Sequence, residues 1–111
     1  MIEEKTMKRA RELFENCSPV FLALGDAQRQ NLVMDIAESG EEGLNVSTLA
    51  SKSHLSRPAI SHHLKVLKDY GLLEPVKKGT QIFYKLKIVD AVESVQLLLD
   101  EMKAIIEKLD L

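Results

Sequence analysis

Hydrophobic residues in the first third of the chain recur at spacings of three and four, which is the pattern of amphipathic helices. This pattern predicts a first helix over residues 3–17. Ser18-Pro19 is expected to end it, because a proline disfavours helical geometry in the residue that precedes it. Asp26 is a suitable N-cap for a second helix over residues 27–38, since its carboxylate can accept a hydrogen bond from a backbone N–H group there.

The middle of the chain has the pattern of a short helix, a tight turn and a long helix. A brief extended piece at residues 44–46 precedes the short helix over residues 48–52, for which Ser47 is the expected cap. Ser56 is expected to cap the long helix. That helix should stop at Gly71, because glycine adopts the left-handed conformation that terminates helices. Its apolar face consists of Ile60, Leu64 and Leu67.

The last third of the chain predicts a β-hairpin followed by a helix. Alternating residues favour strands over 73–77 and 81–86, joined by the turn Lys78-Gly79-Thr80. A final helix over residues 88–110 carries an apolar stripe typical of a coiled-coil seam: Ile88, Val92, Val95, Leu99, Met102, Ile106 and Leu109. The whole pattern predicts a mainly α-helical fold with a small β-hairpin wing, a winged helix-turn-helix in the order α-α-α-α-β-β-α.

The length and composition of the chain indicate a single-domain protein without a membrane span, a signal peptide or an internal disulfide. With 111 residues, the chain is expected to form one domain overall. It has no apolar run of about 18 residues, which a membrane span requires, and its first residues lack the apolar core of a signal peptide. One cysteine, Cys17, cannot form an internal disulfide. These features are expected of a cytoplasmic protein.

The net charge of −2 hides an uneven distribution of charge along the chain. Residues 52–87 hold eight Lys or Arg and two acidic residues, whereas the segments on either side are acidic. A basic centre between acidic ends predicts a polyanionic partner for the centre, and double-stranded DNA is the partner that fits a helix-turn-helix.

Polar and basic residues on the long helix and the wing are the candidates for DNA contact. Arg57 lies at the start of the helix, where it can bind a guanine edge, and Lys65 is one turn beyond Ser61, at a position suited to a phosphate. His63 is expected to pack sideways against the domain. The candidate set is Ser56, Arg57, Pro58, Ser61, His62, Lys65, Lys77, Lys78, Thr80 and Gln81.

The stretch over about residues 19–87 resembles the ArsR/SmtB family of winged-helix repressors. The resemblance rests on the segments Leu24-Gly25-Asp26-Ala27-Gln28-Arg29, Ser61-His62-His63-Leu64-Lys65-Val66-Leu67 with Gly71-Leu72-Leu73, and Gly79 with Phe83-Tyr84-Lys85-Leu86. Ala27 and Gln28 depart from the family's usual Pro and Thr. The resemblance implies a homodimer that sits on operator DNA and leaves it when an effector, here unknown, binds.

The terminal helices are expected to form the homodimer. Residues 1–18 and 88–111 are interpreted as dimerisation helices that flank a DNA-binding domain over residues 19–87. The heptad seam supplies a self-complementary surface, and the first helix could pack beside it. The candidate interface residues are Met7, Ala10, Phe14, Val92, Val95, Leu99, Met102 and Ile106.

Other chemistries find little support in the sequence. In the family that the chain resembles, members that sense metals place Cys pairs on the short helix or Asp/His/His/Glu sets on the last helix. Residues 46–53 hold no cysteine and the last helix holds no histidine, so no metal site and no cofactor are expected. Ser61 and His62 point about 100° apart on a helix, which opposes a catalytic pair, so no enzyme is expected. Two alternatives remain: a winged-helix protein-interaction module without DNA binding, and a repressor that responds to thiol or redox chemistry through Cys17.

Overall fold

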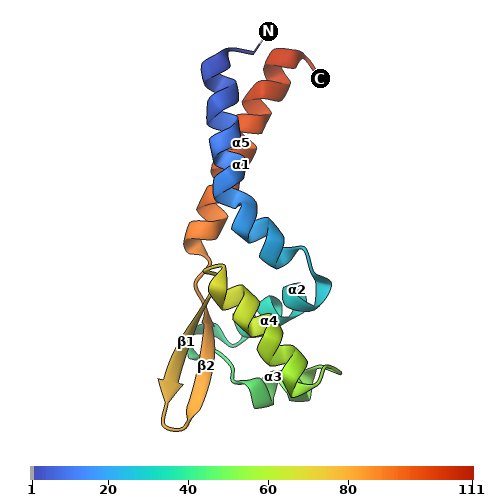
Figure 1. Ribbon diagram of the computed structural model, residues 1–111, viewed down its shortest axis with the longest axis vertical. Helices are drawn as coiled ribbons and strands as arrows, with labels where there is room; N and C mark the ends of the chain where they lie inside the picture. Colours follow the sequence, from blue (N-terminus) through green and yellow to red (C-terminus); the bar gives the residue numbers. More distant parts are fainter. Residues whose placement is uncertain (1) are drawn as a thin grey trace. The chain divides into compact units, whose positions relative to one another are not determined.

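The computed structural model describes residues 2–111, which form a mainly helical chain with one antiparallel hairpin (Figure 1). The order confirms the expected α-α-α-α-β-β-α arrangement. A single 3-10 turn, η1, lies between the second and third helices. The elements are α1 (Glu4–Leu24), α2 (Ala27–Glu38), η1 (Gly40–Glu42), α3 (Val46–Lys52), α4 (Arg57–Asp69), β1 (Leu73–Lys78), β2 (Gln81–Leu86) and α5 (Val89–Leu109).

The chain divides into two compact units. The first consists of the residues up to Pro19 together with Val89–Leu111, and the second of Val20–Ile88. Most of α1 and all of α5 therefore belong to the first unit, while the last turn of α1 belongs to the second. In the described part of the chain, no helix has both the length and the apolar character that crossing a bilayer demands.

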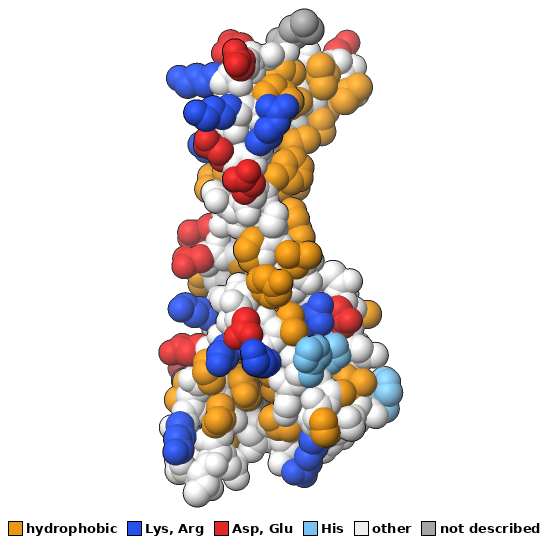
Figure 2. Space-filling view, in the orientation of Figure 1, with side chains coloured by type: hydrophobic (Ala, Val, Ile, Leu, Met, Phe, Trp, Pro, Cys, Tyr) orange, Lys and Arg blue, Asp and Glu red, His pale blue; other side chains and the backbone are white. Residues whose placement is uncertain are grey.

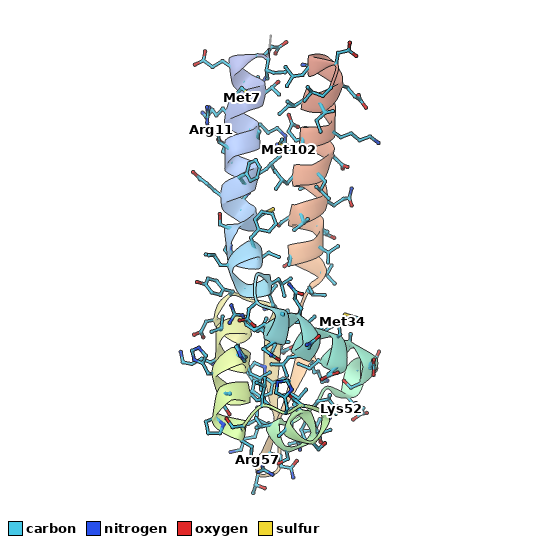
Figure 3. All side chains as sticks on the ribbon, turned by 90° about the vertical axis from the view of Figure 1, so that its right-hand side faces the viewer. Met7, Arg11, Met34, Lys52, Arg57 and Met102 are labelled. Carbon is cyan, nitrogen blue, oxygen red and sulfur yellow. The ribbon has the colours of Figure 1, made fainter. Side chains whose placement is uncertain are left out.

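In the first unit, α1 and α5 lie side by side and run in opposite directions (Figure 1). Leu13 and Cys17 of α1 are buried with Leu98 of α5, and Val95 and Met102 pack against this cluster. Figure 3 shows Met102 directed from α5 toward α1. The Arg9 Nε and a carboxylate oxygen of Glu101 lie 3.5 Å apart across the pair.

The face that α5 buries within the chain lies beside the heptad seam that the sequence assigned to the homodimer. Leu98 and Ile105, which lie outside the seam, are its buried residues. Of the predicted interface residues, Ala10 is buried within the chain and Val95 and Met102 pack on the cluster, because α1 itself covers this face of α5. Four other seam residues are exposed, Val92, Leu99, Ile106 and Leu109, and Ile88, just before α5, is half-buried.

The predicted break at Ser18-Pro19 is wrong, since α1 runs through Pro19 to Leu24. A proline inside a helix removes one backbone N–H and costs about 3 kcal/mol. Burial of Cys17 before the proline and Ala23 after it favours continuing the helix. The Ser18 hydroxyl also donates to the carbonyl of Phe14 at 3.1 Å, a local bond one turn back along the same helix.

The second unit packs α2, α3, α4 and the hairpin around an aliphatic core. The predicted inward residues of α4, Ile60, Leu64 and Leu67, are fully buried, as are Leu32, Ile36, Leu49 and Leu72. Gly71 ends α4 as predicted: it has φ +81°, and the N–H of Leu72 donates back to the carbonyl of Leu67 at 2.9 Å.

The caps of α2 and α4 are those that the sequence predicts, whereas the cap of α3 is different. Asp26 Oδ1 accepts from the backbone N–H of Arg29 at 3.0 Å, and Ser56 Oγ accepts from that of Ala59 at 3.3 Å. Asn45, not Ser47, caps α3, because its Oδ1 accepts from the N–H of Thr48 at 2.9 Å and the helix then starts two residues earlier than expected.

The hairpin is longer and its turn tighter than predicted. β1 extends through Lys78, which pairs with Gln81, so that only Gly79 and Thr80 form the turn. Gly79 has φ +64°, as a two-residue hairpin turn with a leading glycine requires. The expected extended piece near Leu44 pairs with Tyr84 through two backbone hydrogen bonds of 3.1 and 2.8 Å, which adds a third short segment beside the hairpin.

Candidate nucleic-acid interface

The long helix α4 has a buried face and an exposed polar face. Its apolar residues dock on the core of the second unit, while Arg57, Ser61, His62 and Lys65 are exposed. Figure 3 shows Arg57 projecting from the N-terminal end of α4. Pro58 lies in the first turn, where a missing N–H has no helical partner to lose. This arrangement lets the start of the helix approach a nucleic acid while the rest stays anchored.

Two of the predicted contact residues at α4 are already engaged within the chain. Ser56 uses its hydroxyl to cap α4. The ammonium group of Lys65 lies 2.9 Å from Oδ2 of Asp69, and this hydrogen bond lowers the pKa of the Asp69 carboxyl. Both partners of that ion pair are exposed, so the pair is weak and a phosphate can compete for Lys65.

The wing presents Lys77, Thr80 and Gln81 at its surface, all exposed. Lys78 is also part of the wing, but its ammonium lies 3.4 Å from a carboxylate oxygen of Glu42 and 5.0 Å from the centre of the Phe83 ring. The acidic η1 turn therefore restrains one of the four predicted wing residues. Figure 2 shows Lys, Arg and His side chains on the part of the molecule that carries α4 and the hairpin, with fewer acidic groups between them.

An open cleft of about 410 Å³ lies between the wing and the two helices of the helix-turn-helix. Its polar side chains come from three elements. Ser61 belongs to α4, Asn45 and Ser47 lie at the start of α3, and Thr80, Gln81 and Tyr84 belong to the hairpin. No acidic residue lines this cleft, so its surface offers hydrogen-bond donors without repelling an anion.

Arg29 is a structural residue of this unit whose role sequence reasoning missed. Its side chain is only 15% exposed. Its Nε donates to the carbonyl of Ala23 at 2.6 Å, and its Nη2 donates to that of Leu22 at 3.3 Å, where α1 ends. The backbone N–H of Arg29 is also the main reason that the pKa of Asp26 is lowered. The sequence held one signal for this role, because Arg29 belongs to the segment over residues 24–29 that resembles the ArsR/SmtB family.

Cys17 is 0% exposed and lies in the core of the first unit. Over residues 2–111, no group of three or more His, Cys, Asp or Glu side chains is arranged to hold a metal ion. His63 is half-buried against Arg29, in agreement with the expected sideways packing.

Comparisons with known proteins agree with this geometry. The profile of the family described as "Bacterial regulatory protein, arsR family" matches residues 26–74. An uncharacterised HTH-type transcriptional regulator of Methanocaldococcus jannaschii is 33% identical over 91 residues, which cover 82% of this chain and 99% of that protein. Transcriptional repressor SdpR of Bacillus subtilis is 30% identical over 81 residues, 73% of this chain and 87% of SdpR.

A solved structure has the same fold. It is a homodimeric winged helix-turn-helix DNA-binding domain from Mycobacterium bovis, described as a possible ArsR-family transcriptional regulator. Its TM-score to this chain is 0.64 at 26% identity, with 84% of this chain and 86% of that chain covered. The similarity confirms the winged helix-turn-helix fold predicted from the sequence.

Proposed function

Because the chain belongs to the ArsR family of winged helix-turn-helix transcriptional regulators, which act by binding DNA and not by catalysis, we propose that it is a homodimeric repressor of an inverted-repeat operator. Repression is supported by its similarity to SdpR, whose name describes a transcriptional repressor. Such a function would be exercised in the cytoplasm, where the protein has access to DNA.

The single observation that carries the proposal is the two-faced geometry of α4. Ile60, Leu64 and Leu67 anchor the helix, which leaves Arg57, Ser61 and His62 exposed at its N-terminal half. Residues at this end of a recognition helix reach base edges in the major groove. The wing, with Lys77 and Thr80 exposed, supplies a second point of contact with the sugar-phosphate backbone or the minor groove.

A homodimer would give this small reading unit its specificity. Two recognition helices about 34 Å apart can read two half-sites on one side of the duplex. The exposed residues Val92, Leu99 and Ile106 recur every seven residues on α5 and form an unpartnered apolar surface, and Figure 2 shows hydrophobic side chains gathered along this helical pair. Phe14 of α1 is exposed as well. The homodimeric relative from Mycobacterium bovis supports the same assembly.

Selection of bound sequences from random duplexes tests the proposal. We expect an inverted repeat to emerge, and log Kd to rise with log salt by about 0.9 for each phosphate contacted. Arg57→Ala should reduce discrimination at one base pair of each half-site by about 1–3 kcal/mol. Affinity that does not change between about 50 and 200 mM salt would contradict the proposal and favour the protein-interaction alternative.

A further inference from the structure

The side chain of Asn45 makes two hydrogen bonds that join α3 to the wing. Its Oδ1 accepts from the backbone N–H of Thr48 at 2.9 Å, and its Nδ2 donates to Oε1 of Gln81 at 2.6 Å. One end of the amide thus caps the first helix of the helix-turn-helix, while the other holds the strand residue next to the hairpin turn.

The cap determines which end of the Gln81 amide is free. An N-cap must accept from a backbone N–H, so the oxygen of Asn45 points to Thr48 and only its NH₂ group can reach Gln81. Gln81 must then offer its oxygen to Asn45. Its own NH₂ group is left to donate to another acceptor, such as a phosphate oxygen or the acceptor edge of a base.

The backbone beside Asn45 restrains the same part of the wing. Leu44 pairs with Tyr84 through two backbone hydrogen bonds, and this approach depends on Gly43. A Cβ at Gly43 would lie 2.5 Å from the carbonyl oxygen of Tyr84, and its φ of +74° is one that other residues rarely adopt. The segment before α3 is therefore fixed to β2, and the Asn45–Gln81 contact extends this attachment toward the hairpin turn.

We propose that Asn45 is a positioning residue for DNA recognition, which holds Gln81 against α3 and so presents a hydrogen-bond donor at the mouth of the cleft beside Ser61 and Thr80. This inference rests on the proposed DNA-binding function. The ligand of the donor is an acceptor group of the duplex, and the absence of acidic residues along the cleft suits such a group.

Two substitutions separate this role from helix capping. Asn45→Ser keeps an N-cap of similar strength but is too short to reach Gln81. Gln81→Ala removes the partner and leaves the cap intact. Gln96→Ala is the matched control, since Gln96 makes a comparable exposed amide hydrogen bond, 2.9 Å to Asp100, in the other unit.

Operator affinity and wing order are the two measurements. We expect N45S and Q81A each to weaken binding of the selected operator by about 2- to 10-fold, as the loss of one neutral hydrogen bond predicts. The double variant should be no weaker than Q81A alone, because both changes disable the same contact. The slope of log Kd against log salt should stay that of the wild type, since no charge is removed. NMR order parameters of Gly79 and Thr80 should fall in both variants and not in Q96A.

The outcomes distinguish the inference from the proposed function. The inference would be overturned if the affinity losses of N45S and Q81A added up in the double variant, or if N45S bound the operator like the wild type. In either case, binding of the operator by the wild type would still support the proposed function. An N45S loss that follows only a fall in Tm, with Q81A unaffected, would assign Asn45 to capping alone. A wild-type protein with no affinity for any selected duplex would overturn both.

Discussion

Nη1 of Arg29 and Nδ1 of His63 lie 3.3 Å apart, which joins the first turn of α2 to the middle of the recognition helix α4. Arginine can only donate hydrogen bonds, so Nδ1 must be the acceptor and the imidazole proton must lie on Nε2. The same guanidinium binds the carbonyls of Leu22 and Ala23, which the end of α1 leaves without helical partners. One side chain therefore connects three helices.

Replacing Arg29 by Lys should destabilise the second unit although the charge is kept. An ammonium group cannot reach the carbonyls and the imidazole together as the planar guanidinium does. We expect the free energy of unfolding to fall by about 1.5–3 kcal/mol, the range for hydrogen bonds to a charged group, as measured by urea denaturation. Arg11→Lys, at an exposed position of α1, is the control and should change it by less than about 0.5 kcal/mol. If both substitutions lowered the unfolding free energy equally, Arg29 would not be the residue that connects these helices.

Asp26 should make stability sensitive to acid. The hydrogen bond from the Arg29 N–H, followed by the nearby guanidinium charge, lowers the pKa of Asp26 below its ordinary value of 3.8. The stability due to the carboxylate is therefore fully present above pH 3.8 and is lost as the pH falls through the lower pKa of the folded state. Asp26→Asn keeps a capping oxygen but does not titrate. Its unfolding free energy should decline less steeply than that of the wild type between about pH 5 and pH 2. Asp35→Asn, which removes the same charge from α2 without touching the cap, serves as the control.

Asp69→Asn should strengthen DNA binding by releasing Lys65. The carboxylate now holds the lysine at 2.9 Å and would itself repel a phosphate. We expect affinity at low salt to rise by about two- to fivefold, with a steeper salt dependence of log Kd, by up to about 0.9. Glu107→Gln makes the same change of net charge on α5. A similar gain in that variant would mean that net charge, not Lys65, is responsible.

Leu99→Glu should dissociate the proposed homodimer, because it places a charge on the exposed heptad surface of α5. Leu97→Glu is the matched control: Leu97 is 49% exposed and Leu99 56%, but the two side chains project from different sides of the helix. Analytical ultracentrifugation should find L99E monomeric and L97E dimeric. Operator affinity of L99E should fall by at least about tenfold, because two linked half-sites are lost. Dissociation by L97E alone would move the interface to the opposite face.

Cys17 should behave as a core residue and not as a sensor. Its thiol is fully buried beside Leu13 and Leu98, so Cys17→Ser should lower the unfolding free energy by about 1–3 kcal/mol through an unpaired hydroxyl. A thiol reagent should modify the native protein no faster than the protein opens. Rapid modification of the folded protein, together with loss of operator binding, would instead support the thiol-responsive alternative.

Local sequence signals were sufficient to predict the features of the fold that depend on a single residue, such as the start or the end of a helix. The caps at Asp26 and Ser56 and the stop at Gly71 depend on a side chain or a φ angle within a few residues, and each lies where it was predicted. The hydrophobic face of α4 was equally readable, since a helix with one partner surface buries one stripe.

The failures arise where a distant segment alters a local preference. Pro19 should end a helix by itself, but buried residues on both sides keep α1 intact. The seam of α5 predicted a dimer surface, and it did not identify Leu98 and Ile105, which are buried within the chain beside that seam. The contacts of Arg29 and Asn45 join residues 34 and 36 positions apart, and no spacing rule identifies such pairs.

The register of the hairpin has a consequence for how such proteins can diversify. Lys78 pairs directly with Gln81 across a two-residue turn, and side chains along a strand alternate between two sides. Lengthening each strand by one residue would extend the wing by about 3.4 Å, but the side chains at its tip would then face the opposite side. Lengthening each strand by two residues would extend the wing by about 7 Å and keep the same side outward. Natural insertions in the wing that preserve function should therefore add two residues to each strand, or four in all, and an alignment of relatives can test this spacing.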